Sequence, residues 1–440
     1  MSSVKLTTTL RKTEQKGFAQ IDANKIPASA NAFRSKALLA YQSAALPTTS
    51  MEAWRRTDLR NLPADLFRVF TDADPRSPAV PVEILQPVVD DHFGGQLVVT
   101  PHGTERTVGA DLESQGVIFC DLRTAEQNYP ELVAKILGTL VSPEESVFAA
   151  MSASFAQNGA FIYIPQGVHV KQPLHSIFWG AGDGLAFINN ILVYLEEGSS
   201  LTYVHESASP KESADRVMVA TNVEIHVGEN ADLRFVELQS LGSNVWNFSH
   251  ERSRVDSNGK LDWIFGAVGS KLTKNFSDLD LAGEGAWGRM SGFYMTDKNQ
   301  HLDHDTQQNH FAAHTTSDLL FKGALLDSSR SVWQGMIYVA PDAQQTDGYQ
   351  ANRNLILSDK ARADSIPGLE ILADDVRCTH GATVGKLEQE PIFYLKSRGI
   401  PQKEAERIVV EGFFDPIMQR IPFEGVRQRF QDAILQKMKN

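Results

Sequence analysis

The stretch NVEIHVGENADLRFVELQS (222–240) contains two runs in which apolar and polar residues alternate. Alternation with a period of two predicts strands that turn one face to a core and the other to solvent. Gly228 stands between the two runs, where a turn residue is expected. The apolar positions are Val223, Ile225, Val227, Leu233 and Phe235. The stretch therefore predicts two short strands that are joined by a tight turn.

Similar runs recur on both sides of this stretch. They are AFIYIPQG (160–167), NILVYLEEGSSLTYVHES (190–207) and SRVDSNGKLDWIFG (253–266). Their turn glycines, about 30 residues apart, are Gly167, Gly198, Gly228 and Gly259. A repeat of this length is typical of stacked coils, so we expect a mainly β protein with a parallel β-helix (solenoid) core over 158–385. A double-sheet barrel is the rival fold, because it also has short strands and regular turns.

The region before the repeats, 1–157, is expected to be mostly helical with a little sheet. Its predicted elements are a helix over 30–47 that stops at Pro47, a short amphipathic piece over 51–63, and strands over 96–101 and 116–122. A further helix is expected to start at Ser142, because Pro143 suits the first helical position and Glu145 completes a capping box.

The region after the repeats, 386–440, is again expected to be helical. Residues 387–399 form a predicted helix that ends at Gly399, and 400–421 form a second one that begins at Pro401. The apolar stripe of the second helix is Ala405, Ile408, Val409, Phe413 and Ile417. Two helices joined by a tight turn form a helical hairpin, which could cap the solenoid or offer a face to a partner.

Composition narrows the class of protein. The net charge of −12 argues against a nucleic-acid partner, since phosphate binding needs a surplus of Lys and Arg. The apolar runs have the length of strands, so no membrane span is expected. The first residues lack the apolar segment of a secretion signal, and the chain has two cysteines, which favours a reducing cytoplasm.

Cys378 and His380 lie in RCTHGATVGK (377–386), and on a strand their two-residue spacing turns both side chains to the same face. Zinc sites usually take four ligands and iron–sulfur clusters several thiolates, which this chain cannot supply. The other cysteine, Cys120, stands in an apolar run where burial is expected. Two interpretations stay open: a buried thiol beside a histidine bonded to backbone, or a ligand pair that another subunit completes. Gly381 would let a second backbone approach closely.

Histidines cluster in HLDHDTQQNHFAAHTTSD (301–318), together with two aspartates. On a strand three of the four imidazoles would share a face and the first would point away, which matches no common zinc pattern. We therefore expect a solvated strand face whose imidazoles bond to neighbouring side chains, with a metal centre as the alternative. The residues are His301, His304, His310, His314, Asp303 and Asp305.

No conventional active site is evident. Phosphate-binding glycine loops, a nucleophile elbow and a kinase signature are all missing. The paired acidic residues, Glu224 with Glu237 and Asp374 with Asp375, are expected to be solvated rather than catalytic. The chain is therefore predicted not to be an enzyme.

Three stretches resemble the SufB/SufD family, whose members are subunits of the SUF iron–sulfur cluster assembly machinery. They are LEILADDVRCTHGATVGKLEQEPIFYLKSRGIPQKEAERIVVEGFF (369–414), DSSRSVWQGMIYVAPDAQQTDGYQANRNLILSDKARADSIPGLEI (327–371) and MEAWRRTDLRNL (51–62). The resemblance implies a right-handed parallel β-helix between helical ends. It also implies a complex of SufB-, SufC- and SufD-type subunits in which SufC is an ATPase. With only two cysteines the chain resembles the SufD-type subunit more than the SufB type.

The resemblance also implies where the partners act. The family's ligands would correspond to Cys378 and His380, and a transient cluster would form at the boundary with a SufB-type subunit, with no cofactor held stably by this chain alone. The SufC-type ATPase is expected to dock on the helices over 387–421. The residues expected to bind it are Phe393, Tyr394, Arg398, Ile408 and Phe413.

Other functions are alternatives at this point. A β-helix carbohydrate-active enzyme could use carboxylates in a groove, and a metal-dependent oxygenase could use the histidines over 301–314. A homodimer is expected for the isolated chain, because sheet edges invite pairing.

Overall fold

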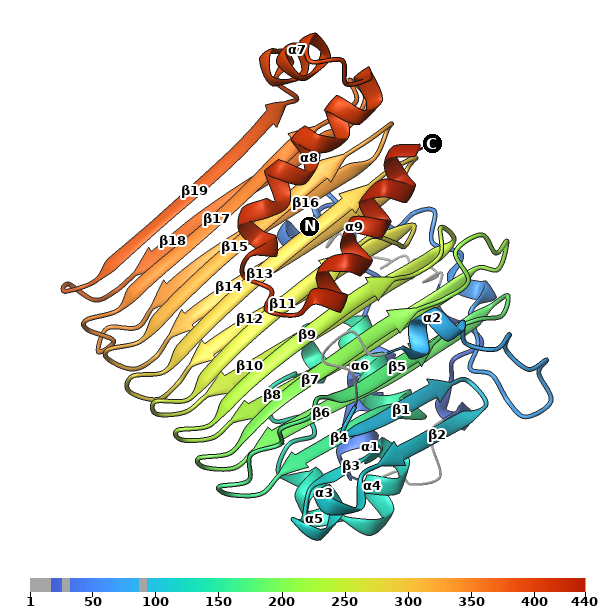
Figure 1. The fold of residues 1–440 in the computed structure, drawn as a ribbon. Coiled ribbons are helices and arrows are strands. Elements are labelled where there is room, and N and C mark those ends of the chain that lie inside the picture. The colour runs from blue at the N-terminus through green and yellow to red at the C-terminus, as the bar shows by residue number, and fades with distance from the viewer. Residues whose placement is uncertain (1–16, 26–31, 87–92, 440) are drawn as a thin grey trace, which may run out of the picture.

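The computed structural model describes residues 17–25, 32–86 and 93–439 and shows a parallel β-solenoid of about 8 turns. Successive strands alternate between two sheets, so each coil gives one strand to each sheet (Figure 1). The first sheet contains β4 (Asn158–Ile164), β6 (Leu185–Leu195), β8 (Val217–Val227), β10 (Val245–Val255), β12 (Leu272–Leu281), β14 (His301–His310), β16 (Arg330–Val339) and β18 (Arg362–Ile371). The second contains β5 (Leu174–Trp179), β7 (Ser200–Ala208), β9 (Asp232–Ser240), β11 (Lys260–Ala267), β13 (Trp287–Thr296), β15 (Thr316–Leu325), β17 (Asp347–Ile356) and β19 (Arg377–Lys386). The predicted parallel β-helix is thus confirmed, and the alternative fold, a double-sheet barrel, is not the one observed.

The coil length agrees with the predicted repeat. Leu272 lies opposite His301, and His301 lies opposite Arg330, so one coil spans 29 residues there. Each coil turns at a residue with positive φ, and these residues stack along one side of the solenoid. The stack consists of Gly167, Gly198, Asn230, Asn258, Gly285, His314 and Gln345. The predicted turn glycines are therefore right in the first two coils, whereas beside Gly228 and Gly259 an asparagine takes the left-handed position, which it tolerates better than most residues.

The two ends of the solenoid differ. At the N-terminal end, the hairpin β1 (Gly95–Thr100) and β2 (Gly103–Val108) extends the second sheet, while β3 (Ile118–Asp121) pairs antiparallel with β4. At the C-terminal end, β18 and β19 are the last strands of their sheets. One end is therefore closed by strands of the N-terminal region, and at the other end no further strand among residues 17–25, 32–86 and 93–439 covers the two edges.

Helices cover the outer faces of both sheets (Figure 1). Trp54, Phe148 and Phe155 of the N-terminal region pack on outward residues of the first sheet, such as Met218 and Phe248. The helices and single turns of this region are η1 (Ala23–Lys25), α1 (Ala32–Ser43), η2 (Glu52–Trp54), η3 (Ala64–Leu66), α2 (Val82–Leu85), α3 (Ala110–Ser114), α4 (Leu122–Asn128), α5 (Pro130–Ala134), η4 (Pro143–Glu145) and α6 (Val147–Phe155).

The C-terminal helices are α7 (Gln389–Ser397), α8 (Gln402–Met418) and α9 (Glu424–Lys439). α8 and α9 lie along the second sheet, where Val410, Phe414 and Phe430 pack on outward residues such as Phe293. The hairpin of α7 and α8 is present, and Gly399 ends α7 with a positive φ. It does not cap the solenoid, however: α8 follows the side of the sheet, and α7 projects past β19 (Figure 1).

Several predicted elements need correction. The apolar stripe of α8 is rotated, since its buried residues are Ala405, Val410, Phe414, Ile417 and Met418. The capping box of Ser142 is present but holds a single turn, η4, and α6 begins after its own N-cap, Ser146. The helix expected over 30–47 is α1, and residues 30–31 lie outside the described residues. The segment 1–16, to which the expectation about a secretion signal applies, also lies outside them.

Among the described residues, no helix combines the length and the apolar content that crossing a membrane requires.

Candidate functional site

Cys378 and His380 lie on β19, the last strand of the second sheet, opposite Gly348 and Gln350 of β17. Cys378 is half-buried and packs with Ile337 and Ala373, so its side chain points into the solenoid. His380 shares this face because it is two residues further along the strand. It is nevertheless exposed, since no further coil covers β19 in the described part of the chain.

The environment of Cys378 keeps its thiol protonated. Burial raises the pKa of Cys378; a hydrogen bond with the backbone N–H of Gly348 partly offsets this, and the nearby carboxylate of Asp347 adds a smaller increase. Cys120, by contrast, is buried in β3, and burial raises its pKa to about 12. Cys120 is thus a core residue, as predicted, and Cys378 is the accessible thiol.

Apolar side chains are exposed around the open end. Both β18 and β19 have a free edge, and such edges readily pair with another chain. The exposed apolar residues on and beside these strands are Leu369, Ile371, Leu372 and Val384. The thiol–imidazole pair therefore lies on a surface with the hydrogen-bonding groups and the apolar area that a second β protein could cover.

The five residues expected to bind a partner fall into two groups. Phe393 and Tyr394 of α7 are exposed by 74% and 57%, and the guanidinium of Arg398 lies 5.2 Å from the Tyr394 ring centre. Ile408 and Phe413 of α8 are only half-buried, and Phe413 packs against the solenoid. The first group forms an exposed aromatic surface, which we call the α7 patch. The second group belongs in part to the helix–sheet contact.

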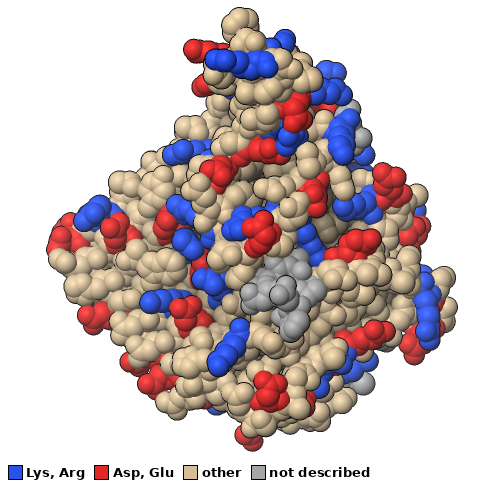
Figure 2. All heavy atoms as spheres, in the orientation of Figure 1, with Lys and Arg blue, Asp and Glu red and all other residues tan. Residues whose placement is uncertain are grey.

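On the face that carries α8 and α9, acidic and basic side chains are interspersed rather than gathered into areas of one sign (Figure 2). This distribution gives no support to a nucleic-acid interface on that face, which would need a continuous basic area.

The clustered histidines do not come together to form a metal centre with one another. Among the described residues, no three His, Cys, Asp or Glu side chains are placed to hold one ion. The solvated face expected for them is also wrong: His304 and His310 are buried inside the solenoid, while His314 is an exposed turn residue. His301 faces outward, where its Nε2 lies 2.7 Å from the Thr57 hydroxyl.

The two aspartates of the cluster pair with a lysine instead. Asp303 is fully buried and lies 2.9 Å from Lys274 Nζ, and Asp305 lies 3.8 Å from the same nitrogen. Thr57 donates a further hydrogen bond to Asp303. This network fixes the N-terminal region on the first sheet, so its role is structural.

The expectation of solvated acidic pairs holds only for Asp374 and Asp375, which are exposed. Glu224 is buried on the outside of the first sheet, where it accepts hydrogen bonds from the backbone of Gly138, Leu140 and Val141. Glu237 is buried inside the solenoid beside Glu251, and burial together with that neighbour raises its pKa well above the usual range. The two predicted partners, Glu224 and Glu237, are thus on different sheets and do not meet.

One neighbour of Cys378 was not predicted. A Cβ atom on Gly348 would lie 3.2 Å from Cys378 Sγ and 3.5 Å from His310 Nε2, so both atoms border the space left by this glycine. The cysteine and the histidine are 68 positions apart in sequence, and only the stacking of coils brings them together. Alternation along each strand could have indicated that His310 and Cys378 both point inward. It could not have given the register between the coils, which brings the two side chains together.

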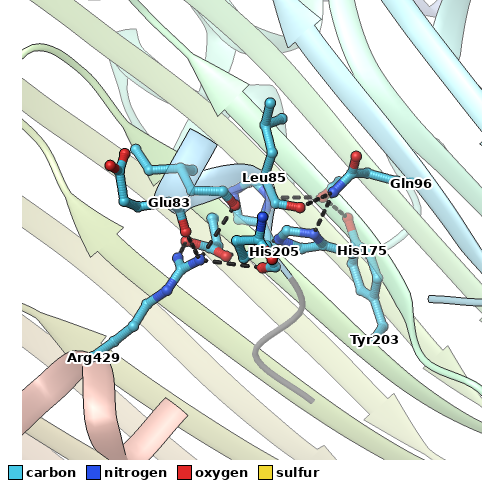
Figure 3. Close-up of polar contacts among 11 residues, drawn as sticks. Glu83, Leu85, Gln96, His175, Tyr203, His205 and Arg429 are labelled. Carbon is cyan, nitrogen blue, oxygen red and sulfur yellow. Dashed lines mark hydrogen bonds and ion pairs between the residues drawn. The ribbon is translucent and has the colours of Figure 1, made fainter. Parts of the chain in front are cut away.

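A second buried polar cluster joins α9 to the N-terminal region (Figure 3). Arg429 of α9 pairs with Glu206, and it donates to backbone carbonyls of Glu83, Ile84 and Gln86. On its other oxygen, Glu206 lies 2.8 Å from Nε2 of the fully buried His175. Arg429 therefore ties the C-terminal helix to α2 and to the second sheet.

The sequence was also compared with known proteins. Residues 178–413 match the family described as SUF system FeS cluster assembly, SufBD core domain, and residues 13–175 match the SufBD protein N-terminal region. The chain belongs to the SufB/SufD family. This SufB/SufD-family chain is 31% identical to the iron-sulfur cluster assembly protein SufD of Bacillus subtilis over 335 residues, which are 76% of either protein. It is also 31% identical to SufB of the same organism over 314 residues, or 71% of this chain and 67% of the relative. An iron-sulfur cluster assembly SufBD family protein of Staphylococcus saprophyticus is equally similar.

Family membership accounts for the site better than the enzyme alternatives do. The SufB/SufD family belongs to the SUF system of cluster assembly. A histidine-ligated oxygenase centre over 301–314 disagrees with the dispersed positions of those histidines in the described solenoid. The comparisons do not separate a SufD-type from a SufB-type subunit, because both relatives are 31% identical.

Proposed function

We propose that this chain is a SufD-type scaffold subunit that supports iron–sulfur cluster assembly without catalysing a reaction itself. The observation that carries the proposal is the position of Cys378 and His380 on the last strand, at an edge that another subunit could cover. The cluster is the product that is assembled at this boundary and is then passed on, not a resident cofactor of the chain. One thiol and one imidazole are too few to hold it, so a SufB-type subunit supplies the remaining ligands.

Two features favour the SufD type. The chain has only two cysteines, and one of them, Cys120, is buried in the core with a raised pKa. A subunit that received sulfur or held a cluster by itself would need more accessible thiolates. The role that remains is to complete a site whose thiolates come mainly from the partner.

The α7 patch is the docking surface that we assign to a SufC-type ATPase. Its two aromatic rings and the stacked guanidinium are the residue types that dominate binding energy in protein interfaces. Phe393→Ala combined with Tyr394→Ala should weaken co-purification of the ATPase at least tenfold. Phe311→Ala is the matched control, since Phe311 is an exposed ring at a turn of the solenoid. Unchanged co-purification by the double variant would reject the patch.

The assembly role is tested in the complete complex. His380→Ala should leave the complex with its SufB- and SufC-type partners intact, because the side chain is exposed, yet reduce the cluster formed per complex. Iron and sulfide content and the visible absorption of the cluster are the readouts. The control is His314→Ala, which removes another exposed imidazole, at a turn of the solenoid two coils before β19. Cluster formation at the normal level by His380→Ala would refute the proposal.

A further inference from the structure

The space above Gly348 is lined by two atoms that bind soft metals. Gly348 lies directly opposite Ser317 on one neighbouring strand of the second sheet and directly opposite Cys378 on the other. The middle residue has no side chain, so Cys378 Sγ and His310 Nε2 approach the same point, 3.2 and 3.5 Å from where a Cβ would be, and the Ile337 Cγ2 methyl borders this point at 3.4 Å. Any residue larger than glycine at 348 would fill this space.

The hydrogen bonds around His310 decide which nitrogen carries its proton. Thr315 donates its hydroxyl proton to the carbonyl of Ala312, 3.1 Å away, so its oxygen accepts from His310 Nδ1 at 2.7 Å. Nε2 therefore carries the lone pair. The Ser317 hydroxyl, 2.9 Å away, donates to Nε2, and it accepts in turn from Gln308 Nε2 at 2.6 Å.

This arrangement prepares His310 for a metal. Metal-binding imidazoles are neutral, and their second nitrogen is usually fixed by a hydrogen bond such as the one to Thr315. The acceptor nitrogen borders the same space as the sulfur.

We propose that His310 Nε2 and Cys378 Sγ together bind one soft divalent cation, of the class of Fe²⁺ or Zn²⁺, in the space above Gly348. This inference rests on the proposed role of Cys378 and adds a ligand on its inner side, away from the exposed His380. A sulfur and an imidazole nitrogen select such cations over Mg²⁺ and Ca²⁺, which prefer oxygen.

Binding requires no redox step. The S–H bond of Cys378 breaks, its proton leaves to solvent, and one metal–sulfur and one metal–nitrogen bond form while the Ser317 hydroxyl gives up Nε2. Two ligands make an incomplete coordination sphere, so water or a partner subunit fills the other positions. His310 and Ser317 are buried, and the half-buried Cys378 is the ligand nearest the open end, so water or a partner would reach the site from the side of Cys378.

The test is a titration of the purified chain with Co²⁺ under reducing, oxygen-free conditions, followed by the thiolate-to-cobalt charge-transfer absorption. The wild-type chain should bind one equivalent, and Cys378→Ser should lack the band. His310→Gln should bind at least about tenfold more weakly, because the loss of a hydrogen-bonding partner of a ligand alone costs about 10- to 100-fold in affinity. His304→Gln is its control, because His304 lies on the same strand and face yet belongs to another aromatic cluster.

A second variant keeps both ligands, so that misfolding of His310→Gln cannot obscure the result. Gly348→Ala fills the space and should also weaken Co²⁺ binding at least about tenfold. Gly381→Ala is its control, since a Cβ there meets nothing within 4 Å. Ser317→Ala removes the competing hydroxyl and should bind at least as tightly as the wild type.

Unchanged Co²⁺ affinity in His310→Gln and Gly348→Ala would overturn the inference, as would a band that depends on His380 instead of His310. The result is independent of cluster formation by the complex. If His380→Ala stops cluster formation while His310→Gln binds Co²⁺ normally, only this inference fails. If His310→Gln loses Co²⁺ but His380→Ala forms clusters, the inner site stands and the proposed function fails.

Discussion

Lys274 and Asp303 show how single charged residues are accommodated between the solenoid and its covering helices. Both side chains are fully buried, and the lysine also lies 4.6 Å from the ring centre of Phe276. Removing one partner of such a pair leaves the other charge buried without compensation. Lys274→Met should therefore lower the free energy of unfolding by about 3–5 kcal/mol, measured by urea denaturation.

Lys274→Met combined with Asp303→Leu is the informative companion, since it removes both charges and should regain most of the loss. Arg60→Ala is the control, because the Arg60–Asp58 pair is exposed and should not contribute measurably. A stability of Lys274→Met equal to that of the wild type would mean that the pair is not buried in solution.

Glu224 gives a prediction about pH. Burial raises the pKa of Glu224 from 4.5 to about 7, although three backbone N–H groups favour the carboxylate. Because the folded form holds the proton more tightly than the unfolded one, the contribution of Glu224 is full below about pH 4.5 and is lost as the pH rises to about 7. The loss amounts to about 3 kcal/mol by linkage.

Glu224→Gln lacks this ionisation, so its stability relative to the wild type should increase between pH 5 and pH 8. Thermal unfolding of both proteins at these two pH values measures the difference. Parallel pH profiles would show that the carboxyl group has an ordinary pKa. A relative decrease for Glu224→Gln would show that the three N–H groups outweigh burial.

At this scale the sequence predicts side-chain direction better than environment. The parity rule correctly placed His304 and His310 on one face, but the polar residues between them favoured solvent as their environment. Inside the solenoid, polar side chains instead satisfy one another, as Gln308, Ser317 and His310 do. Such partners come from neighbouring coils, so their register is needed before burial can be inferred.

Among the elements, α9 depends on a few specific contacts as well as on its apolar face. Arg429 compensates the buried charge of Glu206 and satisfies three backbone carbonyls that follow α2 or belong to it. Arg429→Met should therefore loosen α9 and α2 locally, at a cost of about 3 kcal/mol. Hydrogen exchange should become faster in Val82–Leu85 and in α9 but remain unchanged in β12 and β14.

Gln428→Ala tests the specificity of that effect, because Gln428 is exposed and donates a hydrogen bond to Asp432 of the same helix. Equal exchange rates in Arg429→Met and the wild type would show that apolar packing alone holds α9.

The existence of α7 and α8 was predictable, whereas the buried face of α8 was not. Adjacent apolar residues occur as Val409–Val410 and Phe413–Phe414, so the sequence allows two stripes that differ by one position. The second residue of each pair is buried on the sheet, and the first is half-buried. A helix that lies on a sheet and also borders solvent carries apolar residues on more than one face, and periodicity cannot rank them.

The molecule as a whole has one closed and one open end, and this asymmetry should govern its self-association. We expect the isolated chain to form a homodimer through the edges of β18 and β19, since these edges have exposed apolar residues. Val384→Lys places a charge on this surface and should raise the dissociation constant of the homodimer at least tenfold. Sedimentation velocity over a range of concentrations measures it.

Leu39→Lys is the control, because Leu39 is also apolar and exposed but lies on α1 at the other side of the solenoid. A dimer that survives Val384→Lys would place the contact elsewhere, and a monomer at all concentrations would contradict the expectation.

The overall architecture followed from the sequence because each coil repeats the same alternation and turn. Which end is closed did not follow. β1, β2 and β3 come from a region without the repeat, and they reach the solenoid through pairings that no local pattern encodes, such as Gly95 with Leu174.

Stacking in chain order also sets the order in which the strands can fold during translation. During translation each coil can form on the coil before it, so β19 is the last strand of the solenoid to find its template. A nascent chain that terminates early would finish on an edge lacking both the sulfur and the imidazole. Only polypeptides synthesised through residue 380 can present this edge together with both side chains.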